Sequence, residues 1–162
     1  MSTIRTVVVD DEKPARLRLL ELLQREADVE VVGVASDGEE AVEMVRRLTP
    51  DVLFLDVQMP GLDGFGVLEA LGPEQLPVTI FVTAYDKYAI QAFDAHAIDY
   101  LLKPYGDQRF EDAIRRARKY LGTERARELG GDAVAAARER QSVDAYSGCL
   151  ERVVLKSNGC VT

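Results

Sequence analysis

The stretch DVLFLDVQMPG, residues 51–61, decides the fold. Its apolar residues Val52 to Leu55 run without alternation, which is typical of a strand buried on both faces of a parallel sheet. The run stops at Asp56, and Pro60-Gly61 predicts a turn soon after it. In open α/β sheets, functional groups gather beyond the carboxyl ends of the strands. Asp56 is therefore the first candidate functional residue.

Four other apolar runs repeat this pattern, and a segment with helical spacing follows each of the five runs. The predicted strands are residues 4–9, 29–35, 52–55, 77–84 and 99–102. The predicted helices are residues 13–26, 39–48, 87–97 and 106–121, and residues 61–72 are predicted to form a glycine-rich loop followed by a short helix. Strands that alternate with helices indicate a parallel sheet covered by helices on both faces. We therefore expect an α/β fold with a doubly wound five-stranded parallel sheet over residues 4–121.

Local signals mark helix starts and apolar faces. Ser36 and Asp37 are candidate N-caps, because glutamates follow three residues later in the capping-box pattern. Apolar residues lie at helical spacing in the first and last helices. They are Leu17, Leu20 and Leu23 in the first helix, and Phe110, Ala113, Ile114 and Ala117 in the last.

Composition limits the class of protein. The 162 residues, 47% hydrophobic and 30% charged, predict a soluble globular domain plus a piece of another. No apolar run approaches the roughly 20 residues that span a bilayer, and the N-terminus lacks signal-peptide features, so we expect a cytoplasmic protein with no membrane partner. The net charge of the chain is −8, and its acidic excess lies in residues 1–105, which argues against DNA binding by that part. Cys149 and Cys160 are expected to be free thiols.

The end of the chain differs in composition. Residues 122–148 predict a helical or flexible linker, with a coiled-coil contact as the alternative. Residues 149–162 hold a valine-rich run followed by Asn158-Gly159, which is a strong hairpin signal. We expect this segment to begin an output domain that is largely truncated.

Polar residues follow four of the five predicted strands: Asp10 and Asp11, Asp56, Thr83, and Lys103. Three carboxylates that converge at one edge of the sheet repel one another, and a hard cation such as Mg²⁺ relieves that repulsion. A lysine suits a phosphate oxygen. A carboxylate can attack phosphorus to give an acyl phosphate, so the group predicts phosphoryl transfer to Asp56. His96, the only histidine, is predicted to be structural or on the surface.

Four motifs in order, VVVDDE, LFLDVQMPGLDG, FVTA and YLLKP, resemble the receiver domain of two-component response regulators over residues 3–121. The resemblance implies a receiver domain at residues 1–121 with a flavodoxin-like sheet in the order 2-1-3-4-5. It also implies a role for individual residues. Asp56 would be the phosphoacceptor, and Mg²⁺ would be held by Asp10, Asp11, Asp56 and the Gln58 backbone carbonyl. The phosphoryl group would be contacted by Thr83, the Ala84 backbone and Lys103. Thr83 and Tyr100 would form the switch, and Lys103–Pro104 would be a cis peptide bond.

The resemblance also implies partners. A sensor histidine kinase would donate the phosphoryl group, and phosphorylation would favour a homodimer. The expected dimer face contains Ala89, Ile90, Phe93, Ile98, Arg115 and Arg118. The two arginines belong to a basic cluster of Arg115, Arg116, Arg118 and Lys119. The alternative interpretation of this cluster is an ordinary helix face exposed to solvent.

Residues 83–105, TAYDKYAIQAFDAHAIDYLLKPY, resemble receivers of the LytR/AlgR class, whose output is a mostly β DNA-binding domain. The segment from Leu150 resembles the opening of that domain. DNA binding is therefore expected only through the missing remainder of the output domain.

Two other functions remain open. Haloacid-dehalogenase-like phosphatases also place an aspartate after a buried strand, but they need a second acid where this chain has Gln58. A stand-alone receiver that acts through protein contacts is the other alternative. The leading prediction is a phosphorylation-operated switch that is not otherwise an enzyme.

Overall fold

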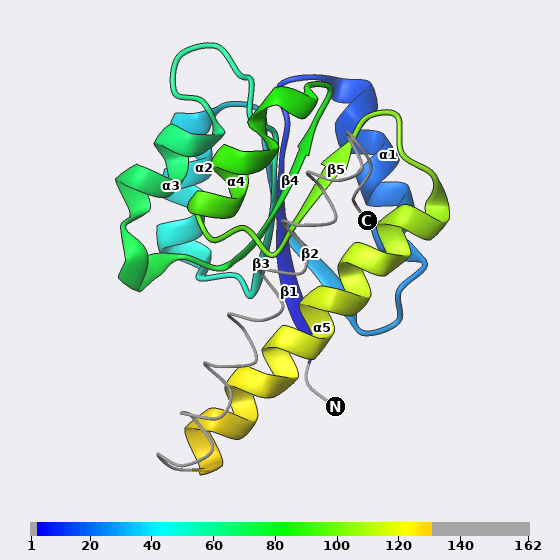
Figure 1. Cartoon of the computed structure of the whole chain (residues 1–162), viewed down its shortest axis with the longest axis vertical. Coiled ribbons are helices and arrows are strands. Elements are labelled where there is room, and N and C mark those ends of the chain that lie inside the picture. The colour runs from blue at the N-terminus through cyan, green and yellow to red at the C-terminus, as the bar shows by residue number, and fades with distance from the viewer. Residues whose placement is uncertain (1–2, 131–162) are drawn as a thin grey trace.

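The computed structural model describes residues 3–130, with side chains as far as residue 124 (Figure 1). Its five strands are β1 (Ile4–Val9), β2 (Val29–Ala35), β3 (Val52–Leu55), β4 (Val78–Thr83) and β5 (Asp99–Leu102). They form one sheet in the order β2-β1-β3-β4-β5, and every neighbouring pair is parallel. The predicted α/β fold and strand order are confirmed.

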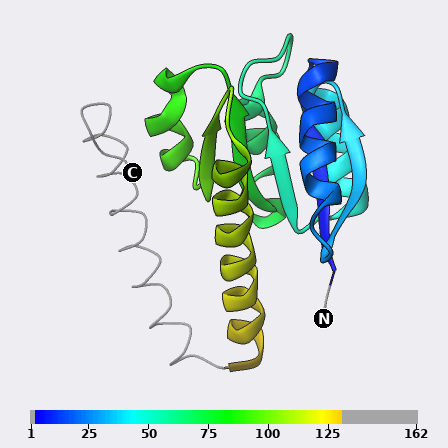
Figure 2. The ribbon, with the colours of Figure 1, turned by 90° about the vertical axis from the view of Figure 1, so that its right-hand side faces the viewer.

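Helices cover both faces of the sheet, as the alternating pattern predicted. They are α1 (Lys13–Gln24), α2 (Gly38–Leu48), α3 (Gly64–Leu71), α4 (Ala89–Asp94) and α5 (Asp107–Gly130), with short 3-10 turns η1 (Pro73–Gln75) and η2 (Asp86–Tyr88). Figure 1 shows α2, α3 and α4 on one side of the sheet and α1 and α5 on the other. The far end of α5 extends past the body of the domain (Figure 2).

The sheet divides the core into two apolar clusters. Leu53 and Leu55 pack in the cluster with α2 and α3, whereas Val52 and Phe54 pack in the cluster with α1 and α5. The four side chains alternate between the faces because successive residues of a strand point in opposite directions. All four are fully buried, and each contributes about 1.5–3 kcal/mol to folding. This anchors β3, which carries Asp56 at its end.

The start of α2 follows the predicted capping pattern. Asp37 is the N-cap, and its Oδ1 accepts a hydrogen bond of 2.8 Å from the Glu40 N–H. In return, Glu40 Oε1 accepts one of 2.8 Å from the Ser36 N–H. The two side chains satisfy backbone donors that the helix leaves unpaired.

The structure corrects the buried face of α1. Leu17 is 54% exposed, while Leu19, Leu22 and Leu23 are buried. Of the three leucines in the predicted spacing, Leu23 is buried and Leu20 packs against the same core cluster, so only Leu17 lies outside the packed face. A single leucine spacing therefore did not define the packed side.

Two helix boundaries also differ from the prediction. Residues 87–97 do not form one helix: η2 comes first, α4 ends at Asp94, and the exposed His96 has a left-handed φ of 66°. In contrast, α5 continues beyond the expected end at Leu121 to Gly130. Gly122 disfavours a helix by only about 1 kcal/mol, and the strong helix formers after it offset that cost.

Between residues 3 and 130, no helix combines the length and the apolar character needed to cross a bilayer. Cys149, Cys160, most of the predicted linker and the predicted start of the output domain lie outside the described residues.

Candidate functional site

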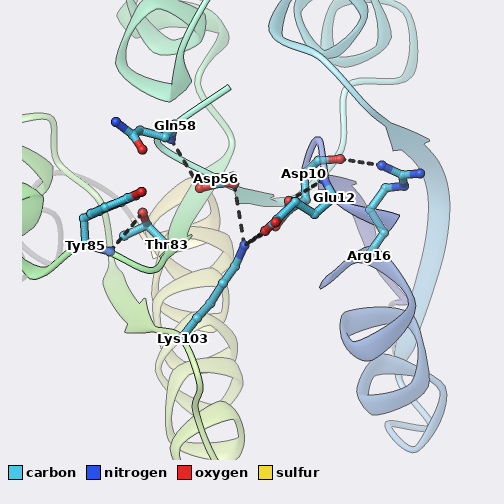
Figure 3. A network of polar contacts seen from close by, with 8 residues as sticks. All are labelled: Asp10, Glu12, Arg16, Asp56, Gln58, Thr83, Tyr85 and Lys103. Carbon is cyan, nitrogen blue, oxygen red and sulfur yellow. Dashed lines mark hydrogen bonds and ion pairs between the residues drawn. The ribbon is translucent and has the colours of Figure 1, made fainter. Parts of the chain in front are cut away.

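Strand register brings the predicted site residues to one edge of the sheet. Val9 pairs with Leu55, so Asp10 and Asp56 leave adjacent strands at the same level. The Asp56 N–H donates a hydrogen bond of 3.0 Å to the Val9 carbonyl, which fixes this register. Thr83 pairs with Leu102 on β5, and Lys103 follows directly. Figure 3 shows Asp10 and Thr83 on opposite sides of Asp56, with Lys103 reaching between the strands.

Three carboxylates meet at this edge. One oxygen from each of Asp10, Asp11 and Asp56 lies within 4.8 Å of the others. Asp10 is 0% exposed and Asp56 is 4% exposed, whereas Asp11 is exposed. An oxygen-rich group with one solvent-facing member suits a divalent cation that keeps part of its water shell. The structure therefore brings together all three predicted carboxylate ligands.

Lys103 supplies the positive charge that faces these carboxylates. Its Nζ lies 2.8 Å from Asp10 Oδ2, 3.5 Å from Glu12 Oε1 and 3.6 Å from Asp56 Oδ2. Its side chain is only 17% exposed. The lysine thus compensates the buried Asp10 directly and stays within ion-pair range of Asp56.

The electrostatics of the site act on Asp56 most strongly. Burial and then the charge of Asp10 raise the pKa of Asp56 to about 7, against the opposing effect of Lys103. For Lys103, burial lowers the pKa, but the hydrogen bond to Asp10 and the charge of Asp56 raise it on balance. The lysine therefore remains charged, but its single positive charge does not fully balance the negative charge of the carboxylates.

The loop after Asp56 is held by the start of α3. The Gly64 N–H donates to the Val57 carbonyl at 2.8 Å. A Cβ at position 64 would lie 2.5 Å from the Asp56 carbonyl oxygen, so no larger side chain fits there without movement. The Gln58 N–H also lies 3.3 Å from Asp56 Oδ1. Close packing thus fixes the loop that carries the Gln58 backbone carbonyl, a predicted ligand of the metal.

The two predicted switch residues are linked by the backbone of Tyr85. The Tyr85 N–H donates to Oγ1 of the buried Thr83 at 3.4 Å, and the Tyr85 carbonyl accepts from the Tyr100 hydroxyl. Burial raises the pKa of Tyr100, so the ring keeps its hydroxyl proton. Ala84, whose backbone is a predicted phosphoryl contact, is the residue between Thr83 and Tyr85. The peptide bond Lys103–Pro104 is cis, as the resemblance implied.

The residues of the predicted dimer face differ in their exposure and in their ion pairs. Ile90 is 56% exposed on α4, and Ala89, Phe93 and Ile98 are partly exposed. Arg115 is exposed on α5 and pairs with Asp112 at 3.0 Å. Arg118, however, binds Asp28 at 2.7 Å and Glu26 at 2.5 Å, both in the segment before β2. Its inclusion in the α4–β5–α5 face was wrong, because the acidic residues before β2 hold it on the α1 side of α5.

A buried ion pair next to Tyr100 was missed from the sequence. Asp99 is 6% exposed, and Arg109 binds both of its oxygens at 2.6 and 3.0 Å. Arg109 also donates to the Tyr100 carbonyl at 3.1 Å, and Arg116 lies 3.5 Å from Asp99. An aspartate inside a strand, followed ten residues later by an arginine on the next helix, was the available signal.

A second missed contact joins Gln58, two residues after Asp56, to Tyr88. Gln58 Nε2 donates to the Tyr88 hydroxyl at 3.2 Å. Tyr88 packs on Phe65, whose ring in turn packs on Phe81 of β4. The loop after Asp56 is therefore tied to the segment that begins α4.

Comparisons with known proteins agree with this geometry. Over 116 residues the chain is 47% identical to the transcriptional regulatory protein BtsR of Escherichia coli, covering 72% of this chain and 48% of BtsR. It is 40% identical over 151 residues to an uncharacterized response regulatory protein of Shewanella oneidensis, covering 93% of this chain and 61% of that protein. The chain spans about half the length of the first curated relatives it matches.

The fold is also found in solved structures. The receiver domain of AraT, a response regulator from Geobacillus stearothermophilus, superposes with a TM-score of 0.70 at 36% identity, covering 76% of this chain and 98% of that one. Residues 6–115 match the family described as response regulator receiver domain. The chain therefore belongs to the response regulators, and these residues are its receiver domain.

Proposed function

We propose that the chain is the input part of a transcriptional response regulator, in which Asp56 accepts a phosphoryl group from a sensor histidine kinase. The observation that carries this proposal is the meeting of three carboxylates, Asp10, Asp11 and Asp56, beside the amino group of Lys103. The lysine hydrogen bond goes to Asp10, and Asp56 keeps only the longer ion pair of 3.6 Å with Lys103. Its oxygens remain available as a nucleophile.

The carboxylate group fits a magnesium ion. The raised pKa of Asp56 reflects charge that Lys103 alone does not balance, and hard oxygen donors with one exposed member match what Mg²⁺ binds. Asp10, Asp11, Asp56 and the backbone carbonyl of Gln58 would hold it. When bound, the ion would neutralise charge on the oxygens of the transferring phosphoryl group.

The transfer itself needs no base, because Asp56 attacks as a carboxylate. A new bond forms between its oxygen and phosphorus as the bond from phosphorus to the histidine nitrogen of the kinase breaks. The histidine ring, protonated on its other nitrogen, takes the electron pair of the broken bond and leaves as neutral imidazole. Lys103 is close enough to turn from Asp10 toward a phosphoryl oxygen, and Thr83 can offer its hydroxyl from the neighbouring strand.

Phosphorylation would be transmitted through the backbone of Tyr85. If Thr83 turns its hydroxyl toward the phosphoryl group, it gives up the Tyr85 N–H, and the Tyr85 carbonyl that holds Tyr100 is then free to move. Tyr100 would repack at the α4–β5–α5 face, which favours a homodimer. We infer transcription control from the greater length of the relatives and from the name of BtsR, a transcriptional regulatory protein. We infer a DNA-binding output of the LytR/AlgR class from the resemblance of residues 83–105 and of the segment from Leu150.

The proposal is tested by incubating the protein with Mg²⁺ and acetyl phosphate, in which the bond from phosphorus to the acetyl oxygen breaks and acetate leaves. The wild-type chain should gain one phosphoryl group, and Asp56→Asn should gain none. Equal labelling of both proteins would exclude Asp56 as the acceptor. Rapid turnover of a small phosphate ester would instead favour a hydrolase, because we propose no enzymatic activity beyond formation and loss of the acyl phosphate.

A further inference from the structure

The turn between β1 and α1 carries two of the three carboxylates, and Asp10 is held there by its neighbours. Its N–H donates to the Ala35 carbonyl at 3.2 Å, and its Oδ1 accepts from the Glu12 N–H at 2.9 Å. Its Oδ2 accepts from Lys103 at 2.8 Å. Its carbonyl oxygen accepts from Arg16 Nη1 at 2.7 Å. Figure 3 shows Arg16 on the side of Asp10 that faces away from Asp56.

Helix α1 lacks the usual means of fixing its start. Its N-cap is Glu12, which makes no side-chain hydrogen bond to the first turn. Arg16, one turn into α1, reaches back to the acidic turn instead. Its guanidinium donates to the Asp10 carbonyl, and its N–H makes the first bond of the helix, to the Glu12 carbonyl at 3.1 Å. One residue therefore ties the helix to both ends of the acidic turn.

We propose that Arg16 is a positioning residue for the metal: it fixes the backbone of the acidic turn so that Asp10 and Asp11 present their carboxylates together. The inference rests on the proposed magnesium-dependent phosphorylation of Asp56. It assigns separate tasks to the two cations beside Asp10. Lys103 holds a carboxylate oxygen and can leave it for a phosphoryl oxygen, whereas Arg16 holds a main-chain oxygen that takes no part in the transfer.

The charge of Arg16 alone would have the opposite effect on metal binding. A cation near three carboxylates repels Mg²⁺, so its removal would tighten binding if charge were the only contribution. Loss of a group that orients metal ligands weakens binding, by about tenfold or more in metalloproteins. The direction of the change therefore separates the two roles.

The test compares Arg16→Met, which keeps the apolar stem, and Arg16→Lys, which keeps a charged donor, with wild type. Arg18→Met is the matched control on the same helix, because Arg18 binds Asp107 at 2.8 Å and the Tyr105 carbonyl at 3.3 Å. Mg²⁺ affinity is measured by titration calorimetry without a phosphodonor. We expect Arg16→Met to bind Mg²⁺ about tenfold more weakly, Arg16→Lys to recover part of the loss, and Arg18→Met to match wild type.

A second readout is the rate of phosphorylation by acetyl phosphate as Mg²⁺ is varied. Arg16→Met should need about tenfold more Mg²⁺ for half its maximal rate and should reach nearly the wild-type maximum. If Arg16→Met does not fold, as judged by circular dichroism, Arg16→Lys carries the test with a smaller shift.

Unchanged or tighter Mg²⁺ binding by Arg16→Met would overturn the proposal, as would equal losses in Arg16→Met and Arg16→Lys. Failure of the proposed function looks different: the wild-type protein itself would then neither bind Mg²⁺ nor be phosphorylated.

Discussion

Lys103 Nζ is hydrogen-bonded to Asp10 at 2.8 Å and stands 3.6 Å from Asp56, so the lysine is anchored to one carboxylate while within reach of the other. Both carboxylates are buried, and the lysine side chain is only 17% exposed. In this arrangement the positive charge stabilises the two buried carboxylates and is within reach of a phosphoryl group on Asp56. The same residue therefore serves folding and, in the proposed transfer, function.

The first prediction concerns this dual role. Replacing Lys103 with Met leaves two buried carboxylates without their cation. This change should lower the free energy of unfolding by about 3 kcal/mol at about pH 8 in the absence of Mg²⁺. The loss should shrink toward about pH 5, because Asp56 then takes up a proton. Urea unfolding measures it, with the exposed Lys119→Met as control. A Lys103→Met protein as stable as wild type at about pH 8 would contradict the importance of the ion pair.

The second prediction concerns pH and metal. Burial and Asp10 raise the pKa of Asp56 from 3.8 to about 7. Between these values the folded state binds more protons than the unfolded state, so the contribution of Asp56 to stability falls as the pH rises through this range. Without Mg²⁺, Asp56→Asn should be more stable than wild type by about 1 kcal/mol or more above the range, and the difference should vanish below it.

Mg²⁺ should stabilise the wild-type protein most above the same pH range, because protons compete with metal for the carboxylates. Thermal unfolding at several pH values, with Mg²⁺ or with a chelator, measures both effects. A stability difference between wild type and Asp56→Asn that stays constant across the whole range would show that Asp56 titrates as an ordinary carboxylate.

The third prediction concerns the buried Asp99. Arg109→Met removes a two-pronged ion pair and the hydrogen bond to the Tyr100 carbonyl, and it should destabilise the protein by about 2 kcal/mol. Arg115→Met on the same helix breaks an exposed pair with Asp112 and should change stability by less than about 0.5 kcal/mol. Chemical unfolding of the two variants checks the contrast. Similar losses in both would mean that burial of Asp99 adds nothing to the pair.

The fourth prediction concerns the switch. Thr83→Ala removes the hydroxyl that accepts a hydrogen bond from the Tyr85 N–H. Asp56 should still be phosphorylated, but the response of dimerisation to beryllofluoride should be at least about tenfold smaller. Thr83→Ser keeps the hydroxyl and is the matched control. Light scattering or sedimentation with and without beryllofluoride measures the response. Full dimerisation of Thr83→Ala would remove Thr83 from the pathway.

Most of the fold and the centre of the site could be predicted from the sequence because each rests on local patterns. Unbroken apolar strands, the Asp37–Glu40 cap and polar residues at the ends of four strands are visible along the chain. Parallel strands then carry Asp10, Asp56 and Lys103 to one edge without further information.

Contacts between distant segments could not be predicted in the same way. Arg118 was assigned to the wrong face because Glu26 and Asp28, which hold it, lie about ninety residues earlier in the chain. Leu17 was grouped with packed leucines because helical spacing alone does not identify the side of α1 that meets the sheet. The contacts of Arg16 and Arg109 were missed because their partners include backbone carbonyls, which no side-chain pattern reveals.

The central claim is tested most directly by intact-protein mass spectrometry after incubation with acetyl phosphate and Mg²⁺, followed by mapping of the modified peptide. We expect one phosphoryl group on Asp56 of the wild-type chain, none on Asp56→Asn, none when Mg²⁺ is chelated, and normal labelling of Asp51→Asn, a control at the other end of β3. A phosphoryl group on Asp56→Asn, or a wild-type chain that stays unmodified with Mg²⁺ present, would contradict the account.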